Sequence, residues 1–519
     1  MPQDAPARRA PAAAGVLAVV TLAAAIVIGA VARWLVLRSS ILNADEAYTG
    51  VEAFEILGGR TPIVLGGTWY TFPFESYVLA PVLAITGASI TVLKALPAVW
   101  WVIAALMVRS TVTRLATARA GWLAAAFVWC TPGALLVLSV TAYESYSSGM
   151  LVTVLAASTA VCALDGARQR RSGGWRSLVL FGALCGLAFW MHPMFLSTVV
   201  PIALVVIVSL ALDGRGAGRA GLQRAAVSVG LVLGGGVTGC APFLAWNAVN
   251  GWPSLQPPVE VEGTYTDRLR TFVVHLLPRG LGLRDAQLAW ELPRWFALPL
   301  YLAVLAGVVA GAALLLAAWR RAHRAALLVV PAALLGVLPI MAVFQNLIFA
   351  ADGRYAVIAF PFLAMALAIA IDALVRRAVG RAAVPMLVAV AAAWVALLAV
   401  PTVRPVRHMP DPAPNAALTE VARRIRDAGF EHVYGTYWTV LPVDFAGDRH
   451  LTSAVLYPLP IRFPDRQRAV EGADHTRVAF VFGAGEDDPG LLWMPVDRYE
   501  RTAIGGFVLY LPRVPASTT

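Results

Sequence analysis

Long uncharged stretches dominate this chain and restrict what it can fold into. Apolar runs lie at 15–37, 90–108, 120–141, 147–164, 177–191, 194–212, 226–247, 295–318, 326–350, 355–375 and 383–402. Since a helix needs about 20 apolar residues to cross a bilayer, these runs predict about eleven transmembrane helices. With 59% hydrophobic and 14% charged residues, the chain is too apolar for a soluble protein. The run Ser76–Gly87 is too short to cross and is predicted to be re-entrant or interfacial.

Arginines mark one side of these runs. If the N-terminus is cytoplasmic, the inside loops carry Arg109, Arg114, Arg119, Arg168, Arg170, Arg171, Arg176, Arg215, Arg219, Arg224, Arg320, Arg321, Arg324, Arg376, Arg377 and Arg381. Cytoplasmic loops are rich in arginine and lysine, so we expect this orientation in a cell membrane, with the C-terminal residues outside. The net charge of +11 therefore reflects topology. It gives no basic folded face of the kind that binds nucleic acid.

The four cysteines lie in apolar runs without metal-ligand spacing, which predicts neither disulfides nor a metal site.

An acidic pair, Asp45 and Glu46, follows the first run. Asn43 with Glu46 three residues later is typical of a capping box. Apolar residues then recur at helical spacing, at Ala47, Val51, Phe54 and Leu57. Gly58 is a stop signal, so we expect a short amphipathic helix along the membrane surface with the acids in its first turn. Acids in a first turn also suit the helix dipole, so a purely structural role is an equal alternative.

Other polar residues stand at the same ends of the runs as the acidic pair. They are Tyr143, Glu144, His192, the loop Asn250–Arg294, Asp352, Gly353 and Arg354. Ionisable groups at membrane depth are costly and are usually functional or paired, so this pattern predicts a site open to the outer leaflet. The alternatives are headgroup contacts for Glu144 and His192, and a helix-end anchor for Arg354.

The composition changes after the last run. Residues 403–415 are polar and proline-rich, which predicts a linker. Leu418, Val421 and Ile425 then form a helical stripe that ends near Gly429. Strand-like runs follow at 432–438, 477–482 and 506–511. We therefore predict a small extracytoplasmic α/β domain at 416–519, in which the sequence shows no catalytic constellation.

Several motifs in order resemble a known family. They are Asp45-Glu46-x-Tyr48, Gly59-Arg60-Thr61-Pro62, Pro73–Gly87, Lys94-Ala95-Leu96-Pro97, Gly186–Pro193, Pro242–Asn247 with Asn250–Pro253, and Gly353-Arg354-Tyr355 with Pro361. With the predicted topology, this set resembles the GT-C superfamily of polytopic glycosyltransferases. It is closest to the bacterial branch of protein O-mannosyltransferases and the lipid A aminoarabinose transferase. The resemblance covers about residues 15–400. Relatives often have lysine at the position of His192, and some carry a second acid near Glu144.

The resemblance implies an all-α, GT-C-like membrane domain over 1–402, with a first outer loop at 38–89 that carries the acidic motif. It also implies transfer, with inversion, of a sugar from a polyprenyl-phosphate donor to an envelope glycan, lipid or protein on the outer face. It specifies neither the sugar nor the acceptor.

Such a displacement needs a base for the acceptor hydroxyl and stabilisation of the leaving phosphate. The expected base is Asp45, with Glu46 beside it to orient substrate or to hold a divalent cation if one is used. Arginine binds phosphate in a bidentate manner, so Arg354 is the expected donor-phosphate ligand, with His192 and Lys94 as further candidates. Substrate contacts are expected from Tyr48, Trp69, Tyr70, Glu144 and Tyr355.

Two other classes of function stay open. A lipid or sugar-lipid transporter would favour charges within spans and broken helices in paired halves. Here the acids lie at span ends and no internal repeat is visible. A non-catalytic envelope scaffold would tolerate replacement of Asp45, whereas a transferase would not.

Overall fold

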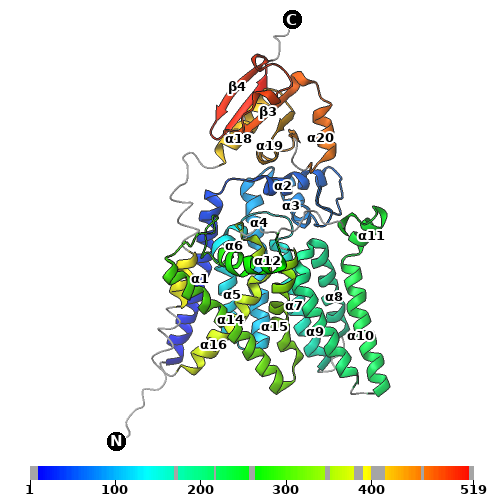
Figure 1. Ribbon diagram of the computed structural model, residues 1–519, viewed down its shortest axis with the longest axis vertical. Coiled ribbons are helices and arrows are strands. Elements are labelled where there is room, and N and C mark those ends of the chain that lie inside the picture. Colours follow the sequence, from blue (N-terminus) through cyan, green and yellow to red (C-terminus); the bar gives the residue numbers. More distant parts are fainter. Residues whose placement is uncertain are drawn as a thin grey trace.

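The computed structural model describes residues 10–168, 174–215, 218–255, 263–344, 351–378, 390–398, 415–456 and 461–513. A helical part and a smaller sheet-containing part are stacked along the long axis (Figure 1). Within the described residues, seven helices are long and apolar enough to cross a membrane. They are α1 (Ala10–Ser39), α4 (Ile90–Leu115), α7 (Ser147–Arg168), α8 (Gly174–Met191), α9 (Leu196–Arg215), α10 (Gly218–Gly239) and α14 (Arg294–Ala322).

The other predicted spans are not single long helices. The run 120–141 is divided into α5 (Ala118–Trp129) and α6 (Gly133–Leu138). Gly133 has φ 62°, and a Cβ there would lie 2.1 Å from the backbone nitrogen of Gly282, so the break requires glycine. The remaining runs form α11 (Ala241–Val249) after α10, α15 (Val329–Phe344), and α16 (Phe360–Arg377). Most of the run 383–402 lies outside the described residues, so the count of eleven stays a prediction.

Shorter helices complete the helical part. The run predicted to be too short to cross is α3 (Phe74–Thr86). The loop 250–294 contains α12 (Tyr265–Thr271), a π-helical turn (Phe272–Leu276) and α13 (Leu277–Gly280).

Glycines allow α8 and α10 to pack backbone against backbone. A Cβ on Gly182 would lie 2.1 Å from the carbonyl oxygen of Val232, and one on Gly186 would lie 2.0 Å from that of Gly236. Small residues drive such close helix contacts in membranes, where burial of apolar area does not.

The predicted capping box is present at the start of α2 (Ala44–Leu57). The Asn43 side chain accepts a hydrogen bond from the Glu46 amide at 3.0 Å, and Glu46 Oε2 accepts one from the Asn43 amide at 3.3 Å. The helix does not lie free on the membrane surface, because the C-terminal part covers it. Phe54 stacks on Phe445 with ring centres 5.6 Å apart. Figure 1 shows α2 between the helical part and the sheet.

The C-terminal part contains a five-stranded sheet in the order β2-β1-β3-β5-β4. Its elements are α18 (Ala416–Asp427), β1 (His432–Gly435), α19 (Tyr437–Ala446), β2 (Thr452–Val455), α20 (Pro464–Glu471), β3 (Val478–Gly483), β4 (Tyr499–Ile504) and β5 (Phe507–Pro512). Strand β1 runs parallel to β2 and β3, whereas β5 is antiparallel to β3 and β4. The predicted helix and all three predicted strands are therefore present, as α18, β1, β3 and β5, together with the unpredicted β2 and β4. The predicted linker 403–415 lies outside the described residues except for Asn415.

The predicted strand 432–438 is wrong at its end. The strand stops at Gly435, and Tyr437 already belongs to the first turn of α19. Tyr437 and Trp438 are therefore not strand residues. They lie on α19, which packs against α2.

Candidate active site

A cavity of about 330 Å³ lies where the helical part meets the C-terminal part. Its wall is assembled from segments far apart in the sequence: Asp45, Tyr48, Leu65, Thr68, Tyr70, Thr71, Tyr143, Glu144, Tyr146, His192, Arg354, Tyr355, Tyr437, Trp438 and Arg462. Its volume is at the small end of the range for ligand pockets, about 300 to 1,000 Å³. Four of the five predicted outer-side segments therefore converge on one space, through Asp45, Tyr143 with Glu144, His192 and Arg354, whereas no described residue of the loop Asn250–Arg294 lines it.

Both carboxylate oxygens of Asp45 face charged or polar partners in this cavity. The Tyr437 hydroxyl donates a hydrogen bond to Oδ1 at 2.8 Å. The Arg354 Nη1 lies 3.8 Å from Oδ2, a loose ion pair. The Asp45 side chain keeps 30% of its surface exposed, so it is oriented by neighbours yet accessible to a ligand.

Arg354 is held under the cavity by an acid and by aromatic rings. Its Nε lies 2.9 Å from Asp352 Oδ2. Its guanidinium lies 5.0 Å, 5.3 Å and 5.8 Å from the ring centres of Tyr143, Tyr146 and Tyr355. Contacts of this kind fix a guanidinium plane without using up all of its donors. Arg354 is thus a preorganised cation that faces Asp45.

His192 also lines the cavity, but as a neutral group. Its Nδ1 accepts a hydrogen bond from the Met194 amide at 3.1 Å, which assigns the ring proton to Nε2. Burial, and then the charge of Arg354, lowers the pKa of His192 to about 3. Since the imidazole is uncharged at neutral pH, it can bind a phosphate only as a hydrogen-bond donor and not as the predicted cation.

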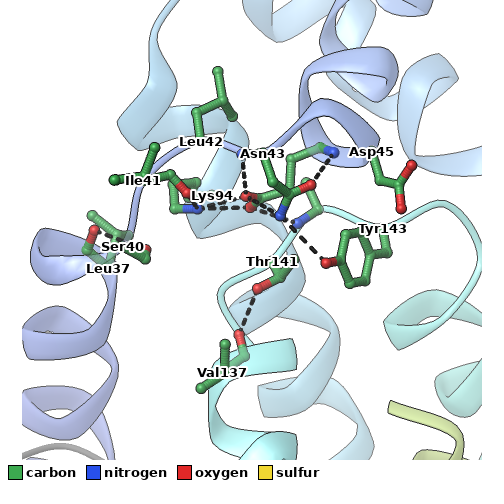
Figure 2. Close-up of polar contacts among 12 residues, drawn as sticks. Leu37, Ser40, Ile41, Leu42, Asn43, Asp45, Lys94, Val137, Thr141 and Tyr143 are labelled. Atoms are coloured by element: carbon green, nitrogen blue, oxygen red, sulfur yellow. Dashed lines mark hydrogen bonds and ion pairs between the residues drawn. The ribbon is translucent and has the colours of Figure 1, made fainter. Parts of the chain in front are cut away.

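Glu46 and Lys94 do not line the cavity. The Lys94 Nζ lies 2.8 Å and 2.7 Å from the two oxygens of Glu46, and each side chain is 1% exposed. The same carboxylate accepts hydrogen bonds from Asn43 Nδ2 at 3.0 Å and from the Ala142 amide at 3.3 Å. Figure 2 shows this network beside Asp45, whose side chain points away from it.

This pairing changes the interpretation of the acidic motif. Lys94 is engaged by Glu46 and does not reach the cavity, contrary to its expected role as a phosphate ligand. The predicted divalent-cation site does not fit either, because the Asp45 and Glu46 side chains face different partners. Within the part of the chain that the structure describes, no group of three or more His, Cys, Asp or Glu side chains is placed to hold a metal ion.

Glu144 reaches the cavity wall but its carboxylate caps a helix. It accepts hydrogen bonds from the backbone amides of Glu75 and Ser76, at 3.0 Å and 3.1 Å, and from the Ser76 hydroxyl. In exchange, Glu75 accepts hydrogen bonds from the Ser145 amide at 2.6 Å and from Ser148 at the start of α7. The two acids thus cap each other's helices. Burial, and then the proximity of Glu75, raises the pKa of Glu144 well above its usual range.

The predicted aromatic contacts divide into two groups. Tyr48, Tyr70 and Tyr355 line the cavity. Trp69 does not: it is 50% exposed and stacks on Trp246 with ring centres 6.4 Å apart. Its backbone has φ 57°, so the chain turns there and directs the indole away from the neighbouring Tyr70.

The sequence reasoning missed every cavity residue of the C-terminal part. Tyr437, Trp438 and Arg462 were not singled out, because no spacing in 416–519 matches a known constellation. Two adjacent aromatic residues, Tyr437 and Trp438, could have indicated a binding surface, but the sequence pattern predicted that they belong to the strand 432–438.

Comparison with solved structures places the fold. No family model and no curated protein sequence matches the chain. The apo structure of ArnT from Cupriavidus metallidurans is similar over 96% of this chain and 98% of that chain, with a TM-score of 0.60 and 14% identity. The structure of ArnT from the same organism bound to undecaprenyl phosphate is similar over 95% of this chain and 97% of that chain, with a TM-score of 0.59 and 12% identity. The oligosaccharyltransferase of Archaeoglobus fulgidus, in complex with zinc and sulfate, has a TM-score of 0.48 and 14% identity over 93% of this chain and 73% of that chain. The likeness to ArnT confirms the predicted GT-C fold over nearly the whole chain.

Proposed function

We propose that this GT-C-fold protein is a membrane glycosyltransferase, which moves a sugar from a polyprenyl-phosphate donor to an envelope acceptor on the outer face of the cell membrane, with inversion. The observation that carries the proposal is the cavity in which a partly exposed carboxylate, Asp45, faces a preorganised arginine, Arg354. Such a transfer needs a base and a phosphate ligand in one sugar-sized cavity, and both of these residues line it. The similar ArnT structure binds undecaprenyl phosphate.

In this proposal Asp45 accepts the proton of the acceptor hydroxyl as that oxygen attacks the anomeric carbon. The bond from the anomeric carbon to the phosphate oxygen breaks, and polyprenyl phosphate leaves. The hydrogen bond from Tyr437 fixes the orientation of the base. Alignment of reacting groups can contribute about 7 to 11 kcal/mol to such a step.

Arg354 stabilises the negative charge on the leaving phosphate. Its ion pair with Asp45, at 3.8 Å, is long enough to be exchanged for a phosphate oxygen, while Asp352 keeps the guanidinium in place. His192 donates one hydrogen bond from Nε2 to the same phosphate. Tyr70 and Tyr355 border the sugar.

The test uses the full protein in lipid nanodiscs with a panel of undecaprenyl-phosphate sugars, with release of undecaprenyl phosphate and formation of glycoside as readouts. Asp45→Asn should reduce turnover by about two orders of magnitude or more, the range for loss of a general base. Asp465→Asn is the matched control, since the Asp465 side chain is 70% exposed on α20. Turnover that survives Asp45→Asn would remove Asp45 as the base. Movement of labelled lipid across the bilayer without glycoside formation would favour a transporter.

A further inference from the structure

We propose that Arg462 forms an anion subsite for the acceptor, which means that the acceptor carries a carboxylate or phosphate close to the hydroxyl that is glycosylated. This inference rests on the proposed function, because it takes Asp45 as the group that receives the acceptor hydroxyl. It assigns a substrate class to the C-terminal part, whose role the sequence leaves open.

Arg462 differs from Arg354 in its partners. Among the residues that the structure describes, no Asp or Glu oxygen lies within ion-pair distance of Arg462, whereas Arg354 faces both Asp45 and Asp352. The Nη1 of Arg462 donates a hydrogen bond to the Gly66 carbonyl at 3.0 Å. Its Nε is buried without a hydrogen-bond partner. A buried guanidinium donor without a partner is costly, and an oxyanion in the cavity would satisfy it.

The Arg462 backbone is fixed before any ligand arrives. A Cβ on Gly66 would lie 2.2 Å from the Arg462 carbonyl oxygen, so only glycine permits this approach of the first outer loop to the C-terminal part. The next residue, Phe463, stacks on Tyr48 with ring centres 4.9 Å apart. The guanidinium itself lies 5.8 Å from the ring centre of Tyr48 and 5.9 Å from that of Tyr437. A cation held in this way loses little freedom when it binds an anion.

Tyr437 links Arg462 to the base. Its hydroxyl holds Oδ1 of Asp45 at 2.8 Å, and its ring lies beside the Arg462 guanidinium. Asp45 and Arg462 therefore flank the same tyrosine on the cavity wall, so a molecule whose hydroxyl meets Asp45 can place a nearby second group against Arg462. This geometry fits a sugar acid or a sugar phosphate.

The position of Arg462 favours the acceptor over the donor. Arg354 lies on the opposite oxygen of Asp45, and its segment leads directly into the apolar helix α16, as expected for a group that meets a lipid-bound phosphate. Arg462 lies two residues before α20 in the C-terminal part, which lies at the far end from the long helices (Figure 1). Trp438, 53% exposed, lines the same cavity and contacts the ring of Tyr437 edge-on, with ring centres 5.1 Å apart.

The experiment compares ligands and variants in nanodiscs at constant ionic strength. The probes are glucuronate, glucose 6-phosphate, neutral glucose and undecaprenyl phosphate, and binding is measured by thermal shift and equilibrium dialysis. The variants are Arg462→Gln, Arg462→Lys, Arg354→Gln and the control Arg468→Gln, whose side chain is 76% exposed on α20 and which removes the same charge. The lysine variant keeps the charge, and therefore tests binding even where the glutamine variant fails to fold.

At least one charged sugar should bind wild type and Arg468→Gln about tenfold or more tightly than glucose, as expected for a charge-assisted hydrogen bond. Arg462→Gln should abolish this preference and Arg462→Lys should reduce it, while both keep the undecaprenyl phosphate affinity that Arg354→Gln loses.

Two results would overturn the inference alone. One is a wild type that binds undecaprenyl phosphate but shows no preference for charged sugars. The other is a loss of undecaprenyl phosphate affinity in Arg462→Lys as large as in Arg354→Gln, since Arg462 would then hold the donor. A wild type that does not bind undecaprenyl phosphate would instead overturn the proposed function, and the acceptor assignment with it.

Discussion

Replacement of Lys94 by methionine tests whether the buried Glu46–Lys94 pair is structural. Methionine keeps the apolar stem but removes two contacts of 2.7 Å and 2.8 Å to the Glu46 carboxylate, which is then left buried with only hydrogen bonds from Asn43 and Ala142. Removing one partner of a buried ion pair typically costs about 3 to 5 kcal/mol. Because whole domains are stable by only about 5 to 15 kcal/mol, the apparent melting temperature should fall clearly.

The double variant Glu46→Gln/Lys94→Met separates the possible causes. It removes both charges, so it should be less destabilised than Lys94→Met alone, and the difference measures the cost of the orphaned carboxylate. Unfolding in nanodiscs is followed by intrinsic fluorescence, and undecaprenyl phosphate affinity is measured on the folded fraction below the transition. We expect that affinity to stay within about twofold of wild type. Lys94 does not line the cavity, so its removal should not change the free energy of binding. A Lys94→Met protein with wild-type stability and lost undecaprenyl phosphate affinity would refute this reasoning and make Lys94 a phosphate ligand.

Three further predictions concern the interface around α2. Burial raises the pKa of Glu52 from 4.5 to about 7, so the folded state favours the protonated acid and loses up to about 3 kcal/mol as the pH rises through this window. Glu52→Gln should therefore match wild type in thermal unfolding at pH 5 and exceed it at pH 8; equal melting temperatures at both pH values would contradict the shift. A Cβ on Gly50 would lie 2.3 Å from the ring of Phe445. Gly50→Leu should therefore destabilise the packing of the C-terminal part on α2 by about 1 to 3 kcal/mol. Hydrogen exchange should become faster in α19 and stay unchanged in α7. Tyr437→Phe removes the hydrogen bond to Asp45, worth about 1.5 to 3 kcal/mol, and should slow sugar transfer about 10- to 100-fold without weakening undecaprenyl phosphate binding; an unchanged rate would show that Asp45 needs no such support.

Local signals in the sequence predicted local structure well. The capping box of Asn43 and Glu46 is formed by residues three apart, so the sequence alone contains all of its partners, and the start of α2 is confirmed. The stop at Gly58 is confirmed for the same reason. The helical stripe that begins at Leu418 also gives the predicted α18, because its periodicity is a property of one segment.

The site could be predicted only in part, because its contacts join distant segments. Asp45, His192 and Arg354 were expected on one side of the membrane domain from topology, and they do line one cavity. No pattern could show that Glu46 would face Lys94, 48 positions away, rather than stand beside Asp45. Tyr437, which donates a hydrogen bond to Asp45, is 392 positions away in the sequence. This contact forms only because the C-terminal part packs on α2.

The two sides of the cavity depend on different parts of the fold. Arg354 is supported by Tyr143, Tyr146 and Tyr355, all within the helical part, so the geometry for a leaving phosphate does not require the C-terminal part. Asp45 is different, because the hydrogen bond that orients it comes from Tyr437 on α19. If the transfer follows the proposed route, donor binding and acceptor activation are therefore separable. Weakening the contact between α2 and α19 should lower turnover at saturating donor while the donor affinity stays constant, and a parallel loss of both would mean that the C-terminal part also shapes the donor side.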